Sequence, residues 1–301
     1  MKYELGRALS TLRESLEFRF SPVSLKDKPA KVRFSGYGLN RVPGLMLSRL
    51  IESPVSGTNE PEKGKLIVLF ADEGNDDEQD LYRSFVRSGS KILVFSRNTK
   101  FEELCRINES LFIKMPELKY PELNFFSQFL IASRAFFDLG LVSAFPSESL
   151  SSFVSKMDFS SSVNSFHEKM WQKNITLLSS EEAYPLAEAW RIFITRYAGV
   201  AVSLDRIIDS LYFRLNSLST VSFILFFISD SDSSVLKRRL KVIREVLPFN
   251  STQMVLKGEF AIYKVLLSSL LGFFLSIELS EKDDPLEYSK VLKDYLSRRF
   301  V

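Results

Sequence analysis

The sequence predicts an α/β fold with two similar units, each a mostly parallel sheet flanked by helices. Short continuous apolar runs of strand length alternate with amphipathic stretches of helical length, which is typical of strands that helices cover on both faces. The same order of strand and helix restarts after a serine-rich segment. A chain of 301 residues is long enough for two domains.

The first half contains four strand-like runs, at Lys31–Phe34, Leu66–Phe70, Lys91–Phe95 and Leu111–Lys114. Apolar residues at helical spacing predict helices at Val42–Ile51, Leu81–Ser88 and Tyr120–Leu139, and glycines follow the last two. The longest helix carries more aromatic surface than one helix facing one sheet normally buries, and this predicts a contact with a second copy of the chain. The aromatic residues are Phe125, Phe126, Phe129, Phe136 and Phe137.

Residues 149–165 contain eight serines and few strong structure signals. We expect them to link an N-terminal domain at residues 1–148 to a C-terminal domain at residues 166–301. The second half is predicted to contain strands at Ile175–Leu178, Thr220–Ile228 and Thr252–Leu256. Its predicted helices are Tyr184–Tyr197, Val235–Glu245, Phe260–Leu279 and Asp284–Phe300.

The composition excludes several classes of site. Forty lysines and arginines against 37 acidic residues give a net charge of +3, too balanced for a nucleic-acid footprint. A single cysteine, Cys105, and a single histidine, His167, exclude a disulfide framework, a multi-cysteine metal site and a two-histidine metal site. We therefore expect neither a metal nor a cofactor.

The most apolar stretch, Phe260–Leu279, is interrupted by Lys264, which leaves too short an uncharged core for a membrane span. We expect a buried helix, no membrane partner and a cytoplasmic location. The basic run Lys237–Lys241 with Arg244 is interpreted as a solvated helix face, and nucleic-acid binding is the alternative.

A short glycine-containing turn between a strand and a helix is a natural anion site, because backbone amides at a helix N-terminus point at the ligand. Ser35–Asn40 fits this pattern, and an ordinary turn is the alternative interpretation.

The segment Phe34–Asn40 and the order of elements resemble the sugar isomerase (SIS) fold. Nearly the whole chain resembles the archaeal bifunctional phosphoglucose/phosphomannose isomerases, which have two SIS domains. Leu66–Leu69 followed by Gly74-Asn75 resembles the strand and phosphate loop of that family. Lys91–Phe95 resembles its next strand and Tyr120–Leu139 its long dimer-interface helix. The ending Asp284-Pro285-Leu286 with Leu292–Leu296 resembles the end of the family's sequences.

The resemblance implies a phosphosugar ligand, a homodimer and an aldose–ketose isomerase. It implies ligand contacts from the two loops, at Ser35, Gly36, Gly38, Asn40, Arg41, Gly74 and Asn75. It also implies that Lys293 is the counterpart of the family's C-terminal lysine. The family has an arginine after its fourth strand, and this chain has only Lys119 or Tyr120 near that position.

Several positions depart from the family. Leu39, Asn40 and Arg41 stand near the place of a Gly-Gly-Ser, where a Cβ would hinder close approach of a ligand. The phosphate loop, rich in hydroxyls in the family, is the acidic segment Asp72–Glu78, which would repel phosphate unless a metal or arginine offsets it. The interpretation that we prefer for this segment is a solvated acidic turn that caps a helix.

The catalytic residues of the family are not matched either. Arg196 aligns with the catalytic glutamate and cannot act as a base at neutral pH, because it stays protonated. The segment aligned with the family's histidine, Leu204–Arg214, contains no histidine. His167 lies outside this segment and is interpreted as a structural or surface histidine. Nothing marks Cys105 as a nucleophile.

Three functions remain open. The one we prefer is a catalytically degenerate relative that binds a phosphosugar or is purely structural. The second is an active isomerase in which another carboxylate replaces the missing base. The third is a phosphosugar-sensing regulator. The candidate substitute carboxylates are Glu181, Glu182, Asp205 and Asp209, although capping of the next helix equally explains the first two.

Overall fold

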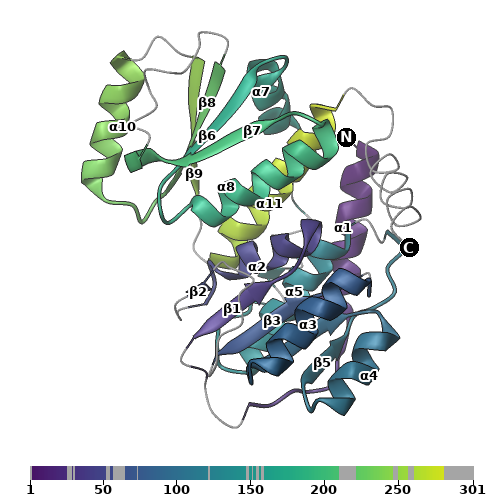
Figure 1. Cartoon of the computed structure of the whole chain (residues 1–301). Coiled ribbons are helices and arrows are strands. Elements are labelled where there is room, and N and C mark those ends of the chain that lie inside the picture. Colours follow the sequence, from purple (N-terminus) through teal and green to yellow (C-terminus); the bar gives the residue numbers. More distant parts are fainter. Residues whose placement is uncertain are drawn as a thin grey trace. The chain divides into compact units, whose positions relative to one another are not determined.

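The computed structural model describes residues 2–25, 29, 31–51, 55–56, 65–72, 74–120, 123–146, 149–150, 152–153, 156, 159–209, 222–246, 250–256 and 261–280. Contacts within the chain divide it into two compact units. We call residues 2–157 the first unit and residues 158–301 the second unit. Each has its own parallel sheet with helices on both faces, so the predicted α/β class is confirmed (Figure 1).

The first unit contains a five-stranded parallel sheet in the order β2-β1-β3-β4-β5. Its strands are β1 (Val32–Ser35), β2 (Val55–Ser56), β3 (Leu66–Phe70), β4 (Lys91–Ser96) and β5 (Leu111–Lys114). The four apolar runs predicted as strands are β1, β3, β4 and β5, with ends that differ by at most one residue. The edge strand β2 has two residues and was not predicted.

Side-chain alternation along the strands divides the first sheet into two faces. Ile67, Leu69, Ile92 and Val94 pack in one cluster with residues of α3 (Asp76–Arg87) and α4 (Thr99–Ile107). On the other face, phenylalanines of β1, β3 and β4 pack together, and Phe136 of α5 (Asn124–Asp138) contacts two of them. Helices α1 (Lys2–Glu17) and α2 (Val42–Leu47) contact α5.

The aromatic side chains of α5 are mostly buried within the chain. Phe125, Phe126, Phe129 and Phe136 are each at most 2% exposed, whereas Phe137 is 44% exposed. The helix starts at Asn124, four residues later than predicted. Most of the aromatic surface expected to contact a second copy is therefore already covered, and the homodimer stays a prediction from the resemblance.

The second unit contains a four-stranded parallel sheet in the order β7-β6-β8-β9. Its strands are β6 (Asn174–Ser179), β7 (Val202–Arg206), β8 (Ser222–Ser229) and β9 (Asn250–Leu256). This order matches β2-β1-β3-β4 of the first unit, strand for strand. Strand β7 was not predicted. Residues 160–165, expected as linker, instead begin helix α7 (Ser160–Met170). The predicted helix Asp284–Phe300 lies outside the described residues.

Two groups of helices cover the second sheet. Ile224, Phe226 and Ile228 of β8 cluster with Leu240 of α10 (Ser234–Val246). On the opposite face, Trp190 of α8 (Tyr184–Phe193) packs edge-on against Phe227 and donates from Nε1 to the Ser268 carbonyl of α11 (Ala261–Glu278), at 2.9 Å. The predicted helix Tyr184–Tyr197 ends in a π-helical turn, η3 (Ile194–Ala198).

Helix α11 has the length and apolar composition of a membrane span. Two thirds of it is buried, however, and it packs against α7, α8 and η3 in the second unit. These contacts are those of a core helix, in keeping with the buried helix predicted here.

Cys105 of α4 lies in the core of the first unit, in one cluster with Tyr82 of α3, and is 1% exposed. Burial raises the pKa of its thiol to about 12. Burial likewise raises the pKa of Tyr82 to about 12, and the Tyr82 hydroxyl donates toward the Leu104 carbonyl or the Ser110 hydroxyl. A protonated, covered thiol is not a nucleophile.

Replacing Gly272 by alanine should destabilise the second unit. Its Cβ would lie 2.5 Å from Trp190 Nε1, and such overpacking costs about 1–3 kcal/mol. Gly6→Ala in α1 is the matched control, because nothing lies within 4 Å of that Cβ and alanine favours a helix by about 1 kcal/mol. Urea denaturation followed by circular dichroism measures both; a Gly272→Ala protein as stable as the wild type contradicts this packing.

Cys105 should resist alkylation in the native protein. At pH 8 about one thiol in ten thousand is ionised, because the pKa lies about four pH units higher. Iodoacetamide followed by mass spectrometry should give modification in denaturant but almost none without it. Since Cys105 is the only cysteine, the readout is unambiguous. Rapid alkylation of the native protein would contradict its burial.

Candidate functional site

The strand order of the first unit reverses between β1 and β3. From β1 the chain crosses to β2 on one side and later to β3 on the other. In open parallel sheets, ligands bind at the carboxyl ends of the strands where the order reverses, since no helix covers that gap. The two loops there are residues 36–41 after β1 and residues 71–75 after β3. We call this place the first crevice.

The glycines of these two loops are required by their surroundings. A Cβ on Gly36 would lie 2.5 Å from the Asn40 carbonyl oxygen and 3.1 Å from that of Phe70, so the loops approach at backbone level. Gly74 has a φ of +64° and its Cβ would overlap the Asn98 side chain. The two predicted loops thus meet in the structure.

The carboxylate of Glu78 joins the two loops. Its Oε2 accepts from the Gly74 amide at 2.7 Å, and its Oε1 accepts from Asn40 Nδ2 at 2.9 Å. Asn75 is the N-cap of α3 and accepts from the Glu78 amide at 2.9 Å. Glu78 is 1% exposed. Sequence reasoning missed this contact, although Asn-x-x-Glu before a helix is the pattern of a capping box.

The acidic segment is not uniformly solvated. Asp72 forms a two-pronged ion pair with Arg97, which follows β4, and the Arg97 Nε to Oδ1 distance is 2.8 Å. Burial acts to lower the pKa of Arg97, but the hydrogen bond and charge of Asp72 outweigh it, and the pKa is raised. Asp76 and Asp77 are exposed in the first turn of α3. The interpretation of a solvated cap is therefore wrong for Asp72 and Glu78. Glu73 lies outside the described residues.

The other predicted ligand residues occupy the same crevice region. Ser35 is the buried last residue of β1, Gly38 begins the short helix η1 (Gly38–Arg41) and Arg41 ends it with an exposed side chain. The Asn40 amide donates to the Tyr37 carbonyl at 2.9 Å, and Tyr37 itself is 45% exposed. All seven predicted ligand-contacting residues therefore lie in or beside two adjacent loops.

The strand order of the second unit reverses at the equivalent place, between β6 and β8. Glu181 and Glu182 follow β6 with exposed side chains, and Glu181 is 3.0 Å from Arg206 of β7 in an ion pair. Arg206 also lies over the ring of Tyr184. We call this place the second crevice.

The loop after β8 is rich in hydroxyl groups. Ser229 ends β8, and Ser231 and Ser233 follow in the loop. The Ser233 hydroxyl accepts from the Leu236 amide at the start of α10, at 3.2 Å. Asp230 is paired with Lys264 at 2.6 Å, and the hydrogen bond from Lys264 lowers its pKa.

Two further hydrogen bonds hold this loop. Lys237 Nζ donates to the Asp230 carbonyl at 2.7 Å, and Asp232 Oδ2 accepts from the Ser229 amide at 2.6 Å. This loop is the turn between β8 and α10. Its equivalence to the loop after β3 follows from the strand order.

Residues aligned with the catalytic groups of the resembled family do not form an acid–base site. Arg196 is half-buried in the π-helical turn η3. Asp205 is half-buried in β7 and Asp209 is exposed three residues beyond that strand. Lys293 lies outside the described residues. His167 is in the last turn of α7, where its ring contacts that of Trp171.

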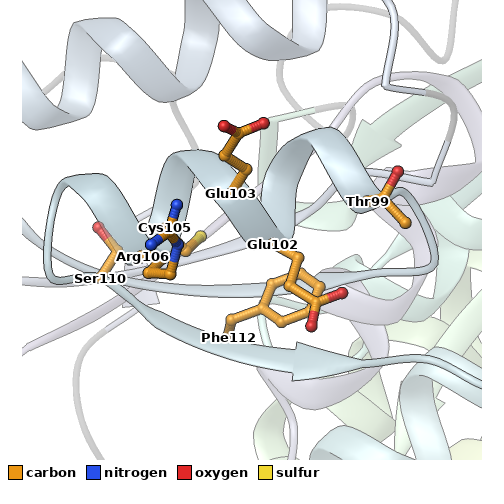
Figure 2. Close-up of a pocket in the computed structure, with 7 residues that line it drawn as sticks. All are labelled: Thr99, Glu102, Glu103, Cys105, Arg106, Ser110 and Phe112. Carbon is orange, nitrogen blue, oxygen red and sulfur yellow. The ribbon is translucent and has the colours of Figure 1, made fainter.

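A groove of about 560 Å³ lies on the outer flank of the first unit, between α4 and β5 (Figure 2). Its lining residues are Thr99, Glu102, Glu103, Cys105, Arg106, Ser110 and Phe112. Glu102 is paired with Lys114 at 3.2 Å, and the Cys105 thiol is protonated. The groove therefore offers no activated catalytic group. Among the residues that the structure describes, no cluster of His, Cys, Asp and Glu could hold a metal ion.

No protein-family model matches the sequence, and no curated protein matches it. Solved structures do match the fold. A glucose-6-phosphate isomerase-like protein from Thermus thermophilus has a TM-score of 0.58 at 13% identity, over 98% of this chain and 96% of that one. Glucosamine-6-phosphate deaminase from Thermotoga maritima has a TM-score of 0.58 at 14% identity, over 92% and 93%.

The C-terminal domain of glucosamine-fructose-6-phosphate aminotransferase from Francisella tularensis has a TM-score of 0.57 at 14% identity. That match covers 92% of this chain and 93% of that one. At such low identity the similarity is one of fold. The chain therefore has the sugar isomerase fold, which these sugar-phosphate proteins share.

Proposed function

We propose that this chain is a catalytically degenerate relative of the phosphosugar isomerases that binds a sugar phosphate without isomerising it. The fold supports the substrate class, because the similar solved structures are of sugar-phosphate proteins. The observation that carries the loss of activity is the half-buried Arg196 at the position aligned with the catalytic glutamate.

Aldose–ketose isomerisation moves a proton between two neighbouring carbons, and a positioned base must accept it. A guanidinium stays protonated and cannot do so. The candidate substitutes are poorly suited: Glu181 is engaged with Arg206, and Asp209 is exposed to solvent. A carboxylate exposed to solvent is not held in place by the protein and gains nothing from preorganisation.

We propose further that the phosphate binds at the second crevice. The loop at residues 229–234 offers hydroxyl groups at the N-terminus of α10, a position that favours anions. Lys237 and Lys264 both reach this loop, so two ammonium groups offset the charges of Asp230 and Asp232. Residues 71–75 of the first unit contain two carboxylates and no serine, whereas this loop has serines beside its two carboxylates.

Purified protein should show no turnover of fructose 6-phosphate or mannose 6-phosphate above the uncatalysed background, because Arg196 stands at the position aligned with the base. A coupled assay that detects glucose 6-phosphate measures the first reaction directly, and adding phosphoglucose isomerase as a coupling enzyme lets the same assay detect fructose 6-phosphate formed from mannose 6-phosphate. Turnover that Lys293→Ala abolishes would contradict the degenerate assignment and favour the active isomerase.

Sugar phosphates should raise the melting temperature, and unphosphorylated glucose should not. A ligand at about 100 times its dissociation constant adds roughly 2.7 kcal/mol of stability. Lys264→Met should weaken the affinity for the sugar phosphate at least about tenfold, since a charge-assisted hydrogen bond is worth roughly 1.5–3 kcal/mol, and the stabilisation at the same ligand concentration should fall to about half. Lys241→Met, on the exposed side of α10, is the matched control. Equal effects of both variants would contradict the second crevice as the site, and no shift with any sugar phosphate would contradict the binding function.

A further inference from the structure

The side chain of Glu78 occupies the first crevice in the manner of a bound anion. One carboxylate oxygen accepts from the Gly74 amide just before α3, and the other accepts from Asn40 in the loop after β1. These partners belong to two different loops, and Asn40 is 38 residues from Glu78 along the chain. The carboxylate therefore bridges the two sides of the crevice, as a ligand would.

The burial of this carboxylate separates it from an ordinary helix cap. In a capping box the glutamate at the third helical position bonds back to the amide of its own cap residue, whereas Glu78 bonds to the Gly74 amide, one residue before the cap, and to Asn40 in another loop. Glu78 is 1% exposed, whereas Asp76 and Asp77 in the same turn are exposed. A buried carboxylate is costly unless hydrogen bonds satisfy it, and the dipole of α3 adds favourable potential at this end.

We infer that Glu78 is a built-in anionic ligand that closes the first crevice to phosphate groups. A phosphate that entered would compete for the Gly74 amide and the Asn40 amide group, both of which Glu78 already engages. It would also meet a buried negative charge in a medium where like charges repel strongly. The nearby Arg97 offers little compensation, because Asp72 already pairs with it.

Exclusion of phosphate ligands from the first unit is thus assigned to Glu78. This assignment does not depend on the proposed binding at the second crevice, because the residues involved belong to different units. Removing the carboxylate should convert the first crevice into a phosphate site, provided that the exposed charges of Asp76 and Asp77 are removed as well.

Isothermal titration calorimetry with inorganic phosphate at low ionic strength tests this. The reference is the double variant Asp76→Ser/Asp77→Ser, which keeps Glu78 in place. Adding Glu78→Ala to it should give roughly one further phosphate per chain, bound by the freed amides. Adding Glu78→Gln instead should give none, because glutamine has the same shape and still fills the crevice.

A Glu78→Ala triple variant that folds, as judged by circular dichroism, but binds no more phosphate than the double variant would overturn the inference. So would a double variant that gains the site by itself, since the exposed charges alone would then exclude phosphate. If alanine prevents folding, Glu78→Ser in the same background is measured with the same expectation.

The result of this titration can be told apart from a failure of the proposed function. A wild type that binds no phosphate contradicts binding at the second crevice, and a gain on removing Glu78 would still support its role in the first.

Discussion

The parallel pairing of β1 with β3 is the constraint on which the first crevice depends. It aligns Val32 with Leu66 and Ser35 with Leu69, so both strands end at nearly the same level and their loops emerge side by side. The close approach of Gly36 to the Phe70 carbonyl and the bond from Asn40 to Glu78 both follow from that register. A slip by one residue would reverse the faces of β1 and separate these partners.

The two units use one topology with different electrostatics. In the first, a carboxylate is buried at the start of α3 and satisfied by a backbone amide and an asparagine. In the second, the corresponding loop is exposed, contains hydroxyls and contacts two lysines. The difference lies in which side chains follow the third strand of each sheet, since the backbone framework is shared. The fold therefore does not by itself determine what either crevice accepts.

The sequence was sufficient to predict strands that are buried on both faces, because these are continuous apolar runs such as Leu66–Phe70. It was insufficient for edge strands. Val202–Arg206 has one neighbour, β6, and its side chains are half-buried or exposed, so no run of apolar residues marks it. The π-helical turn after Phe193 was also missed, since its residues continue the helical spacing.

The loops of the first crevice were predicted from glycine positions and from the resemblance, and they do meet. The acidic segment was harder to interpret, because the capping-box pattern marks Glu78 as a cap but does not predict that its carboxylate is buried while Asp77 is exposed. That difference depends on Asn40, which only the strand order brings near. Pairings between loops distant in sequence are invisible to local patterns.

The repetition of one strand order in both units has an evolutionary consequence. A chain with two copies of the same crevice can lose binding in one without losing its fold, because the loops, unlike the sheet core, tolerate substitution. At the first crevice, the Glu78 carboxylate gives the Gly74 amide and Asn40 a permanent acceptor from within the chain. The loops of the first unit can therefore hold their arrangement without any ligand.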